Sequence, residues 1–226
     1  MTLLHSVAPD IWVADTPHRF IGLHIGSRMT IVRLKSGMLV LHSPIALSTA
    51  LREEITALGS VGHIICPNLF HHVYAAEAVA AFPEALLHGP AKLHRKRKDL
   101  DFDTEFSETP HPDWKDELLP LTMQGSLLHE TLLYHPASRT LISCDLVENF
   151  NRCEHWFTRW YLKLGGIFGK VGWHPVLRLV YLNRRRARES VAKLLEWPFQ
   201  RAIVAHGDII TENAHTAVSK GLAWLF

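Results

Sequence analysis

Four side chains near the ends of apolar runs have the chemistry of metal ligands. His71 and His72 follow the run HIICPNLF, Asp145 lies near the end of RTLISCDL, and His206 lies near the end of RAIVAHGD. A carboxylate at the end of an apolar strand is costly to bury unless it is paired, hydrogen-bonded or bound to a metal. Zinc and similar ions need about three protein ligands, with one position left for water in a catalytic site. One of the adjacent histidines, with Asp145 and His206, supplies that number and predicts one divalent ion, zinc before others.

The two adjacent histidines also have a structural interpretation. Both can be polar residues of a turn, and the 16 histidines of the chain make accidental proximity common. Because neighbouring side chains diverge, at most one of the pair is expected to bind a given ion directly, and the other then hydrogen-bonds nearby groups. After His206, Gly207 permits close backbone approach and Asp208 is available to orient the ring.

Other reactive side chains are open to several interpretations. Glu130 begins the run ETLLY and is a ligand, a general base or a surface residue. Cys144 points to the opposite strand face from Asp145 because side chains alternate, and Cys66 lies within an apolar run, so both are expected in the core. The sequence has no G-x-S-x-G, G-x-G-x-x-G or P-loop motif, so a serine nucleophile and nucleotide binding by these routes have no support.

Composition narrows the class of protein. The 226 residues contain no Pro/Gly/Ser-rich linker, which predicts one domain over residues 1–226. The net charge of +2 gives no overall electrostatic footprint for nucleic acid, so no nucleic-acid partner is expected. Three scattered cysteines without a C-x-x-C pair, and the lack of a signal-peptide pattern at the N-terminus, favour the cytoplasm. No apolar run reaches about 18 uncharged residues, so no transmembrane segment is expected.

The elements that must position the four side chains follow from periodicity. The first 50 residues alternate in short apolar runs, with a hairpin turn at KSG (35–37), and predict antiparallel sheet. The next segments predict a helix, a strand, a helix and a strand, over residues 46–59, 61–67, 75–83 and 85–90. Residues 92–117 have no clear period and predict a surface loop.

The second half repeats this mixture. Strands are predicted over 118–123, 130–136, 139–146 and 201–208, and helices over 187–197 and 214–225. The HPAS sequence (135–138) predicts a hairpin turn between two of these strands. Residues 150–182 are aromatic and irregular, with helix breaks at their Gly and Pro positions, and we expect a mostly helical insertion or lid whose aromatic side chains face inward.

The order of these motifs resembles the metallo-β-lactamase superfamily over nearly the whole chain. A His-bearing turn after a strand, a later hairpin ending in CDL and a last strand ending in AHGD carry the resemblance. Within the superfamily, the stretches HRFIGLHIGSRMTIVRLKSGMLVLHSP, PNLFHHVY and WPFQRAIVAHGDII look like an uncharacterised family, a domain of unknown function. The resemblance implies an α/β fold, an αββα sandwich of two packed mixed sheets with helices outside.

The resemblance also places the site residues. Asp145 matches the metal-bridging Asp and His206 the last His ligand, whereas the segment NLFHHV matches the His-x-His-x-Asp-His motif imperfectly, with Asn68 and Phe70 in the two leading His positions. His72 falls in the position of the Asp, so we favour His72 over His71 as the side chain that faces the site. We therefore expect Asp145 and His206 to share one pocket with one of the two histidines.

Three functions remain open at this point. The first is a metal-dependent hydrolase of a small ester, lactone, thioester or phosphoester with one ion, in which Asp145 and Glu130 serve catalysis. The second is a non-catalytic binding or regulatory protein that kept the fold and lost its metal, which the broken motif favours. The third is contact with a membrane surface or a partner through the aromatic and basic residues of 156–182.

Overall fold

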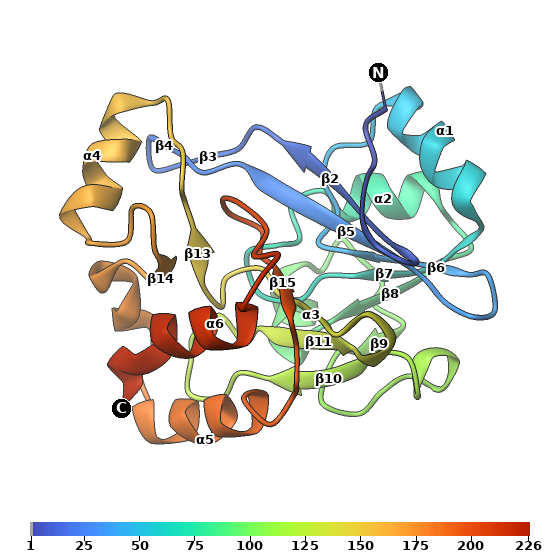
Figure 1. The fold of residues 1–226 in the computed structure, drawn as a ribbon. Coiled ribbons are helices and arrows are strands. Elements are labelled where there is room, and N and C mark those ends of the chain that lie inside the picture. The colour runs from blue at the N-terminus through green and yellow to red at the C-terminus, as the bar shows by residue number, and fades with distance from the viewer. Residues whose placement is uncertain (1) are drawn as a thin grey trace.

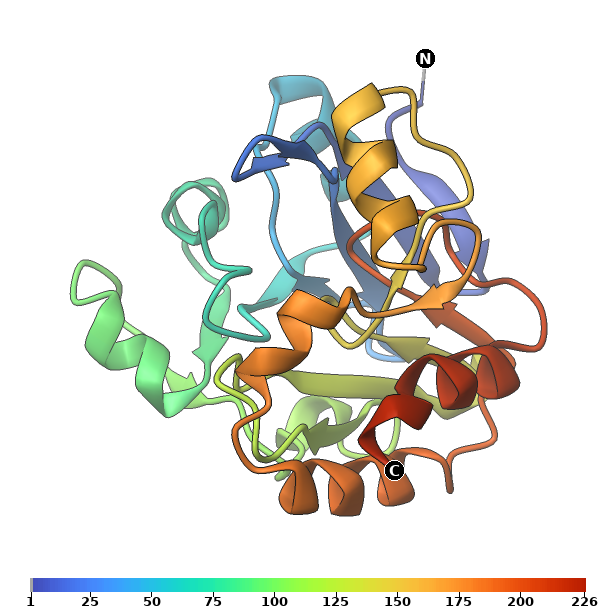
Figure 2. The same ribbon diagram turned by 90° about the vertical axis from the view of Figure 1, so that its left-hand side faces the viewer.

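Two mixed β-sheets packed face to face, with helices on their outer faces, make up the protein. The computed structural model describes residues 2–226 (Figure 1). Helices α1 and α2 lie against one sheet and α5 and α6 against the other, and the rotated view shows the same layers (Figure 2). The predicted α/β sandwich of two mixed sheets is therefore confirmed.

The first sheet has seven strands in the order β1-β2-β5-β6-β7-β8-β9. Its first four strands pair antiparallel, and β6 through β9 pair parallel. The strands and the helices that accompany them are β1 (His5–Ala8), β2 (Ile11–Thr16), β5 (Ser27–Arg33), β6 (Leu39–His42), α1 (Thr49–Leu58), β7 (Val61–Ile65), α2 (Ala75–Ala81), β8 (Leu86–Gly89), α3 (Ala91–Lys96) and β9 (Thr104–Glu105).

The second sheet has four strands in the order β10-β11-β12-β15, of which only the last pair is parallel. Its elements are the 3-10 turn η1 (Pro112–Trp114), β10 (Leu119–Thr122), β11 (Thr131–His135), η2 (Pro136–Ser138), β12 (Thr140–Ile142), α5 (Arg184–Leu194), β15 (Arg201–Ile203), α6 (Ala214–Leu222) and η4 (Ala223–Leu225). Two small two-stranded ribbons and two helices complete the fold. One ribbon pairs β3 (Arg19–Phe20) with β4 (Leu23–His24), and the other pairs β13 (Glu148–Asn149) with β14 (Val171–Gly172). The helices are α4 (Trp156–Leu164) and the 3-10 helix η3 (Pro175–Val180).

Strand alternation explains why the first sheet is buried on both faces. In β5, Met29 and Ile31 pack with the core beneath α1 and α2, whereas Val32 packs between the two sheets. The same alternation in β6 sends Leu41 to the helix side and Val40 to the space between the sheets. Successive side chains of a strand point to opposite faces, so near-continuous apolar runs are needed where both faces are covered.

Local signals in the sequence set the limits of helix α1. The Ser48 hydroxyl accepts a hydrogen bond from the Leu51 N–H at 3.2 Å and caps the helix, and Leu51 and Ile55 turn inward one helical turn apart. Gly59 ends the helix with a φ of 159°, where a Cβ atom would lie 2.5 Å from the Gly37 carbonyl oxygen. The helix predicted over residues 46–59 is thus confirmed, with its first turn three residues later than expected.

Two predicted segments differ from the structure. Residues 92–117, expected as a surface loop, contain α3, β9 and η1, and they bury Phe106 and Trp114, which lie in the core between the sheets. Residues 150–182 hold α4 and η3 but also β14 and irregular chain, so they are less helical than predicted. The expectation that their aromatic side chains face inward is wrong for Trp156 and Trp160, which are 71% and 54% exposed. No helix among residues 2–226 is both long and apolar enough to span a membrane.

The β3–β4 hairpin joins the first sheet to α4. The carbonyl of His18 accepts hydrogen bonds from the N–H groups of Ile25 and Gly26, at 3.1 and 3.2 Å, which closes the base of the hairpin. The His24 N–H donates to the Thr158 hydroxyl at 2.8 Å, and Figure 1 shows α4 beside this hairpin. The hairpin is thereby fixed at both its base and its strand β4.

A buried histidine on β6 makes the stability depend on pH. His42 is 1% exposed, its Nε2 atom has no hydrogen-bond partner, and burial lowers its pKa to about 3. Below the ordinary histidine pKa near 6.5 the unfolded chain takes up a proton that the folded chain does not, so stability falls as the pH falls from about 6.5 toward 3. We expect His42 alone to account for roughly 2 kcal/mol of lost unfolding free energy at pH 5.

Urea unfolding at pH 7 and pH 5 checks this. Between pH 7 and pH 5 the wild type should lose roughly 2 kcal/mol more unfolding free energy than a His42→Gln variant does. An equal loss in both proteins would show that His42 takes up its proton without unfolding.

Candidate metal centre

Three strand ends converge on one group of side chains. His71 follows β7 of the first sheet, whereas Asp145 and His206 follow β12 and β15 of the second. Because β12 and β15 pair in parallel register, with Ile142 beside Ile203, the chain leaves both strands at the same edge of the sheet. This pairing brings together residues 61 positions apart in the chain.

Asp145 lies between the two imidazole rings. Its Oδ2 is 3.4 Å from His71 Nε2, and its Oδ1 is 3.3 Å from His206 Nε2. One ligand atom from each residue lies within 4.8 Å of both others. The side chains are only 8%, 16% and 7% exposed, in chain order, so the group is largely shielded from water.

The outer nitrogen of each ring is already hydrogen-bonded. His206 Nδ1 donates to the Gly26 carbonyl oxygen at 2.8 Å, and since a carbonyl can only accept, Nδ1 carries the hydrogen. His71 Nδ1 is 2.8 Å from the Ser43 hydroxyl, which donates or accepts. In both rings the Nε2 atom therefore faces Asp145, the orientation that metal-binding histidines adopt when a partner fixes the other nitrogen.

Charge on this group is set by burial and by the partners. Burial disfavours ionisation of Asp145, but the His71 charge and the hydrogen bond from His206 outweigh it and hold the pKa of Asp145 below its usual range. Burial lowers the pKa of His206, but its contact with Asp145 has the larger combined effect and the pKa is raised. The histidine Nε2 and the aspartate oxygen therefore need a cation, a proton or a metal ion, between them.

Asn68 positions the group and is not one of its ligands. Its Nδ2 donates to Asp145 Oδ2 at 2.7 Å, and its Oδ1 accepts the N–H groups of Phe70 and His71 at 2.8 Å each. These partners fix the orientation of the amide, because backbone N–H groups can only donate. Asn68 thus holds the turn that carries His71 and one oxygen of Asp145 at the same time.

Glu130 supports the turn that carries Asp145. Its two oxygens accept the N–H groups of Cys144 and Asp145, at 2.6 and 3.0 Å, and its side chain is buried. Burial and the nearby Asp145 charge raise the pKa of Glu130. Both Glu130 oxygens accept backbone N–H groups, which favours a role in positioning the turn. These contacts do not support the predicted role of Glu130 as a ligand or general base.

The sequence is similar to a known family, and the fold is similar to known structures. Residues 9–94 match the model of a family described as a domain of unknown function, DUF4336. No curated protein matches the sequence. The fold is similar to that of a metallo-β-lactamase from Pontibacter korlensis, with a TM-score of 0.68, 14% identity, and coverage of 98% of this chain and 97% of that one. The metallo-β-lactamase IND-7 is similar at a TM-score of 0.66 and 13% identity, covering 98% of this chain and 96% of that chain.

A third structure differs in length. The metal-soaked Flv1 flavodiiron core from Synechocystis sp. PCC6803 has a TM-score of 0.68 and 14% identity, and the similarity covers 98% of this chain but 60% of the other. In all three comparisons the similarity covers 98% of this chain. The chain has the metallo-β-lactamase fold.

Within this metallo-β-lactamase fold, the preference for His72 is corrected. His72 Nδ1 accepts a hydrogen bond from Arg97 at 3.0 Å, and Arg97 also donates to the His72 carbonyl at 2.9 Å. The ring that lies beside Asp145 belongs to His71. The physical reason is the Asn68 turn, because its two backbone hydrogen bonds bend the chain so that residue 71, and not residue 72, points toward the second sheet.

The role suggested for Asp208 is also corrected. Asp208 Oδ2 accepts hydrogen bonds from the backbone and side chain of Asn151, at 3.3 and 3.0 Å, while His206 is oriented by the Gly26 carbonyl. Sequence reasoning missed this carbonyl because a backbone group leaves no signal in residue types. The predicted core positions of Cys66 and Cys144 are confirmed, since both are fully or almost fully buried.

Two further residues near this centre were missed. Arg28 is 9% exposed and donates to the carbonyls of Val204 and Gly207, at 2.6 and 3.0 Å, so it ties β5 to the segment that carries His206. His18, at the base of the β3–β4 hairpin, has a pKa lowered by burial and then by the charges of His206 and His71. The sequence signal for Arg28 was its position within the apolar run SRMTIVRL, and His18 had no comparable signal.

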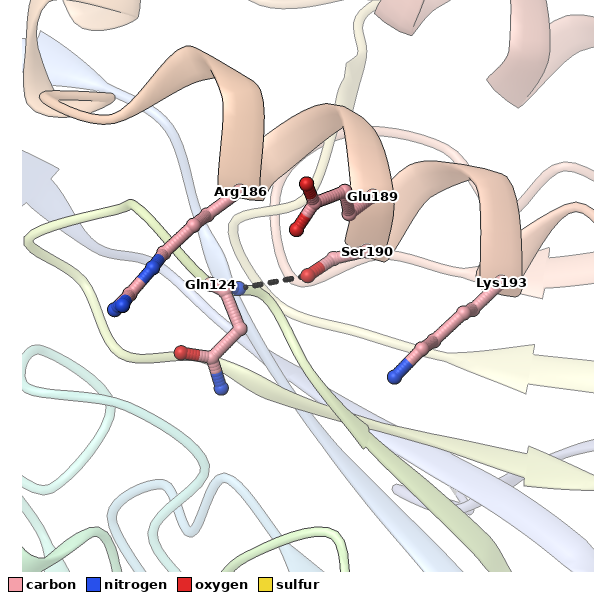
Figure 3. Close-up of a pocket in the computed structure, with 5 residues that line it drawn as sticks. All are labelled: Gln124, Arg186, Glu189, Ser190 and Lys193. Carbon is pink, nitrogen blue, oxygen red and sulfur yellow. Dashed lines mark hydrogen bonds between the residues drawn. The ribbon is translucent and has the colours of Figure 1, made fainter.

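A shallow pocket elsewhere is not part of the centre. It is lined by Gln124 and by four residues of α5, namely Arg186, Glu189, Ser190 and Lys193 (Figure 3). The Gln124 N–H donates to the Ser190 hydroxyl at 3.0 Å, which fastens α5 to the end of β10. This contact accounts for the buried serine, and we assign the pocket no chemistry.

Proposed function

We propose that the protein is a metal-dependent hydrolase that uses one divalent ion, held by His71 Nε2, Asp145 and His206 Nε2. The observation that carries the proposal is the hydrogen bond from His206 Nδ1 to the Gly26 carbonyl, which leaves Nε2 facing Asp145 Oδ1 at 3.3 Å. Two imidazoles and one carboxylate suit zinc, and three protein ligands leave a position for water. The similarity of the fold to metallo-β-lactamases also supports a metal-dependent hydrolase.

The chain's own groups define what happens at this site. A divalent ion would supply Lewis acidity, polarising a carbonyl or phosphoryl oxygen and activating water. Asn68 keeps Asp145 in place through its amide, and Ser43 and Gly26 hold the two rings, so the ligand set is oriented before any ion arrives. The substrate classes proposed are small esters, lactones, thioesters and phosphoesters.

One observation favours a non-catalytic protein with the same fold. Asp145 Oδ2 already accepts a hydrogen bond from Asn68, and a protonated His206 would pair with Oδ1, so the group is satisfied without an ion. Phe70, in a position where the resemblance expects a ligand, is 48% exposed and cannot bind metal. In this alternative the buried charges hold the two sheets together and the protein binds a partner or small molecule without catalysis.

Replacing each of the adjacent histidines by alanine separates the two functions. His71→Ala should bind about one equivalent of zinc fewer than the wild type and lose hydrolysis, since a direct ligand is removed. His72→Ala is the matched control, because its ring contacts Arg97, and it should keep both the metal and the activity. Elemental analysis of protein purified without chelator, with a hydrolysis assay over the four substrate classes, gives the answer.

Equal zinc content in the wild type and both variants would contradict the proposal. Zinc loss in His71→Ala with no hydrolysis of any class by the wild type would retain the metal site but contradict the hydrolase, whereas a wild type with neither zinc nor hydrolysis would favour the alternative.

A further inference from the structure

A second group of histidines lies at the edge of the first sheet where β7, β8 and β9 pair. His63 of β7 and His88 of β8 are each 1% exposed, and the rings of His63, His88 and His111 all lie against Trp114, with centroids 4.6 to 5.0 Å from its ring. Asp113 completes the group from the 3-10 turn η1. None of these residues takes part in the centre formed by His71, Asp145 and His206.

Ligand atoms in this group are spaced as they are around a metal ion. His63 Nε2 is 3.2 Å and His111 Nδ1 is 3.6 Å from Asp113 Oδ2. One ligand atom from each of the three residues lies within 4.8 Å of both others. Zinc–nitrogen bonds of about 2.0–2.1 Å in a tetrahedron give ligand-to-ligand distances of roughly 3.3 Å, so the two shorter separations are close to those of a tetrahedral site.

His63 presents an unpartnered nitrogen to this space. Its Nδ1 is 3.0 Å from His88 Nε2, and His88 Nδ1 is hydrogen-bonded to the Thr104 hydroxyl. Its Nε2 is buried and has no hydrogen-bond partner of good geometry, although Asp113 Oδ2 lies 3.2 Å away. A buried imidazole nitrogen without a hydrogen bond, close to a carboxylate and a second imidazole nitrogen, is available to coordinate an ion.

The hydrogen bonds around the rings suit ligation. His111 Nδ1 accepts a long hydrogen bond of 3.3 Å from the Asp113 N–H, so this nitrogen also carries a lone pair, which an ion would take over. The relay from Thr104 through His88 fixes the ring of His63, as hydrogen-bond partners do for metal-binding histidines.

Entry to the group is from solvent. The side chain of Asp113 is 40% exposed and that of His111 is 20% exposed, while Trp114 beneath them is almost completely buried. An ion can therefore reach the ligands without unfolding the sheet, and the fourth position is open to water.

We propose that His63, His111 and Asp113 bind a divalent transition-metal ion, zinc before others, which fastens the turn η1 to strand β7. Two imidazoles and a carboxylate select zinc over magnesium or calcium, which prefer all-oxygen sites. Because η1 carries Trp114 into the core between the sheets, the ion stabilises the fold. This inference is independent of the hydrolase proposed above.

Zinc binding by the full-length chain tests the inference. Protein freed of metal by a chelator is titrated with Zn²⁺ and, for spectroscopy, with Co²⁺. The wild type should bind one equivalent more than His111→Ala or Asp113→Asn, and its thermal midpoint should rise further on adding Zn²⁺. Asp116→Asn is the matched control, an exposed acidic residue three positions after Asp113 and just beyond η1, and it should bind as the wild type does.

The two sites are separated by the variant His206→Ala, which should keep the equivalent bound at η1 and its tetrahedral Co²⁺ absorption. Far-ultraviolet circular dichroism shows that each variant is folded. Wild-type stoichiometry and unchanged Co²⁺ absorption in both His111→Ala and Asp113→Asn would overturn the inference and leave a hydrogen-bonded histidine cluster without metal.

Discussion

Replacing Gly207 by alanine is expected to destabilise the protein by about 3 kcal/mol and to disable the metal centre with it. Gly207 has a φ of 88°, and a Cβ atom there would lie 2.1 Å from the Asn149 carbonyl oxygen and 2.6 Å from its carbon. The neighbouring backbone cannot move freely, since the Asp208 N–H donates to that same oxygen. Any shift that relieves the clash moves His206, the adjacent residue.

Gly22→Ala is the matched control for this prediction. Gly22 also has a positive φ, of 80°, but no atom lies within 4 Å of its virtual Cβ, so only the backbone strain of about 1 kcal/mol is expected. Urea unfolding of both variants and zinc content of both proteins measure the difference. If Gly207→Ala loses no more stability than Gly22→Ala, then the contact with Asn149 is not rigid and the argument is wrong.

Asp145→Asn is expected to have the largest effect on metal binding. The variant loses the only negative charge of the ligand set, and the two Nε2 atoms then face a neutral amide. Affinity for zinc should fall by more than the roughly 10- to 100-fold loss that follows removal of a ligand's hydrogen-bond partner. Hydrolysis should fall with it, while the fold is kept, because Asn can still accept the hydrogen bond from Asn68.

Asp208→Asn controls for the loss of a negative charge close to His206. Its carboxylate binds Asn151 and does not touch the ligand rings, so zinc affinity measured by competition with a chromophoric chelator should stay within a few-fold of the wild type. If both variants weaken zinc equally, the effect is one of overall charge, and direct ligation by Asp145 is refuted.

The alternation of apolar residues predicted most strands of the two sheets, but not β9. Met29, Ile31 and Val32 belong to a run whose two faces are both apolar, and the structure covers both faces of that strand. Helix α1 was visible from its apolar period and from Gly59 at its end, but its start after the Ser48 cap was not. The loop of residues 92–117 was mistaken because its short elements are held by distant packing of Trp114, which no local period reveals.

The site was predictable in part. Asp145 and His206 stand out because a charged or polar residue follows an apolar strand, and the structure brings them together. Which of His71 and His72 faces the site depends on the turn at Asn68, whose side-chain oxygen accepts the backbone N–H groups of the residues that follow. Alignment to a family motif gives the position of each residue in the sequence but does not predict this turn. The histidine group around η1 was missed because its members are spread over 51 residues with no regular spacing.

The parallel pairing of β12 with β15, and the hydrogen bond from His206 to Gly26 across 180 residues, have a consequence for folding order. Contacts of such high sequence separation form late, because the entropy of closing a long loop must be overcome first. During synthesis the first sheet can form while β15 is still within the ribosome, and His206 emerges after the other residues of the candidate centre. The ion loading that we propose for this centre is therefore coupled to the late pairing of β15 with β12.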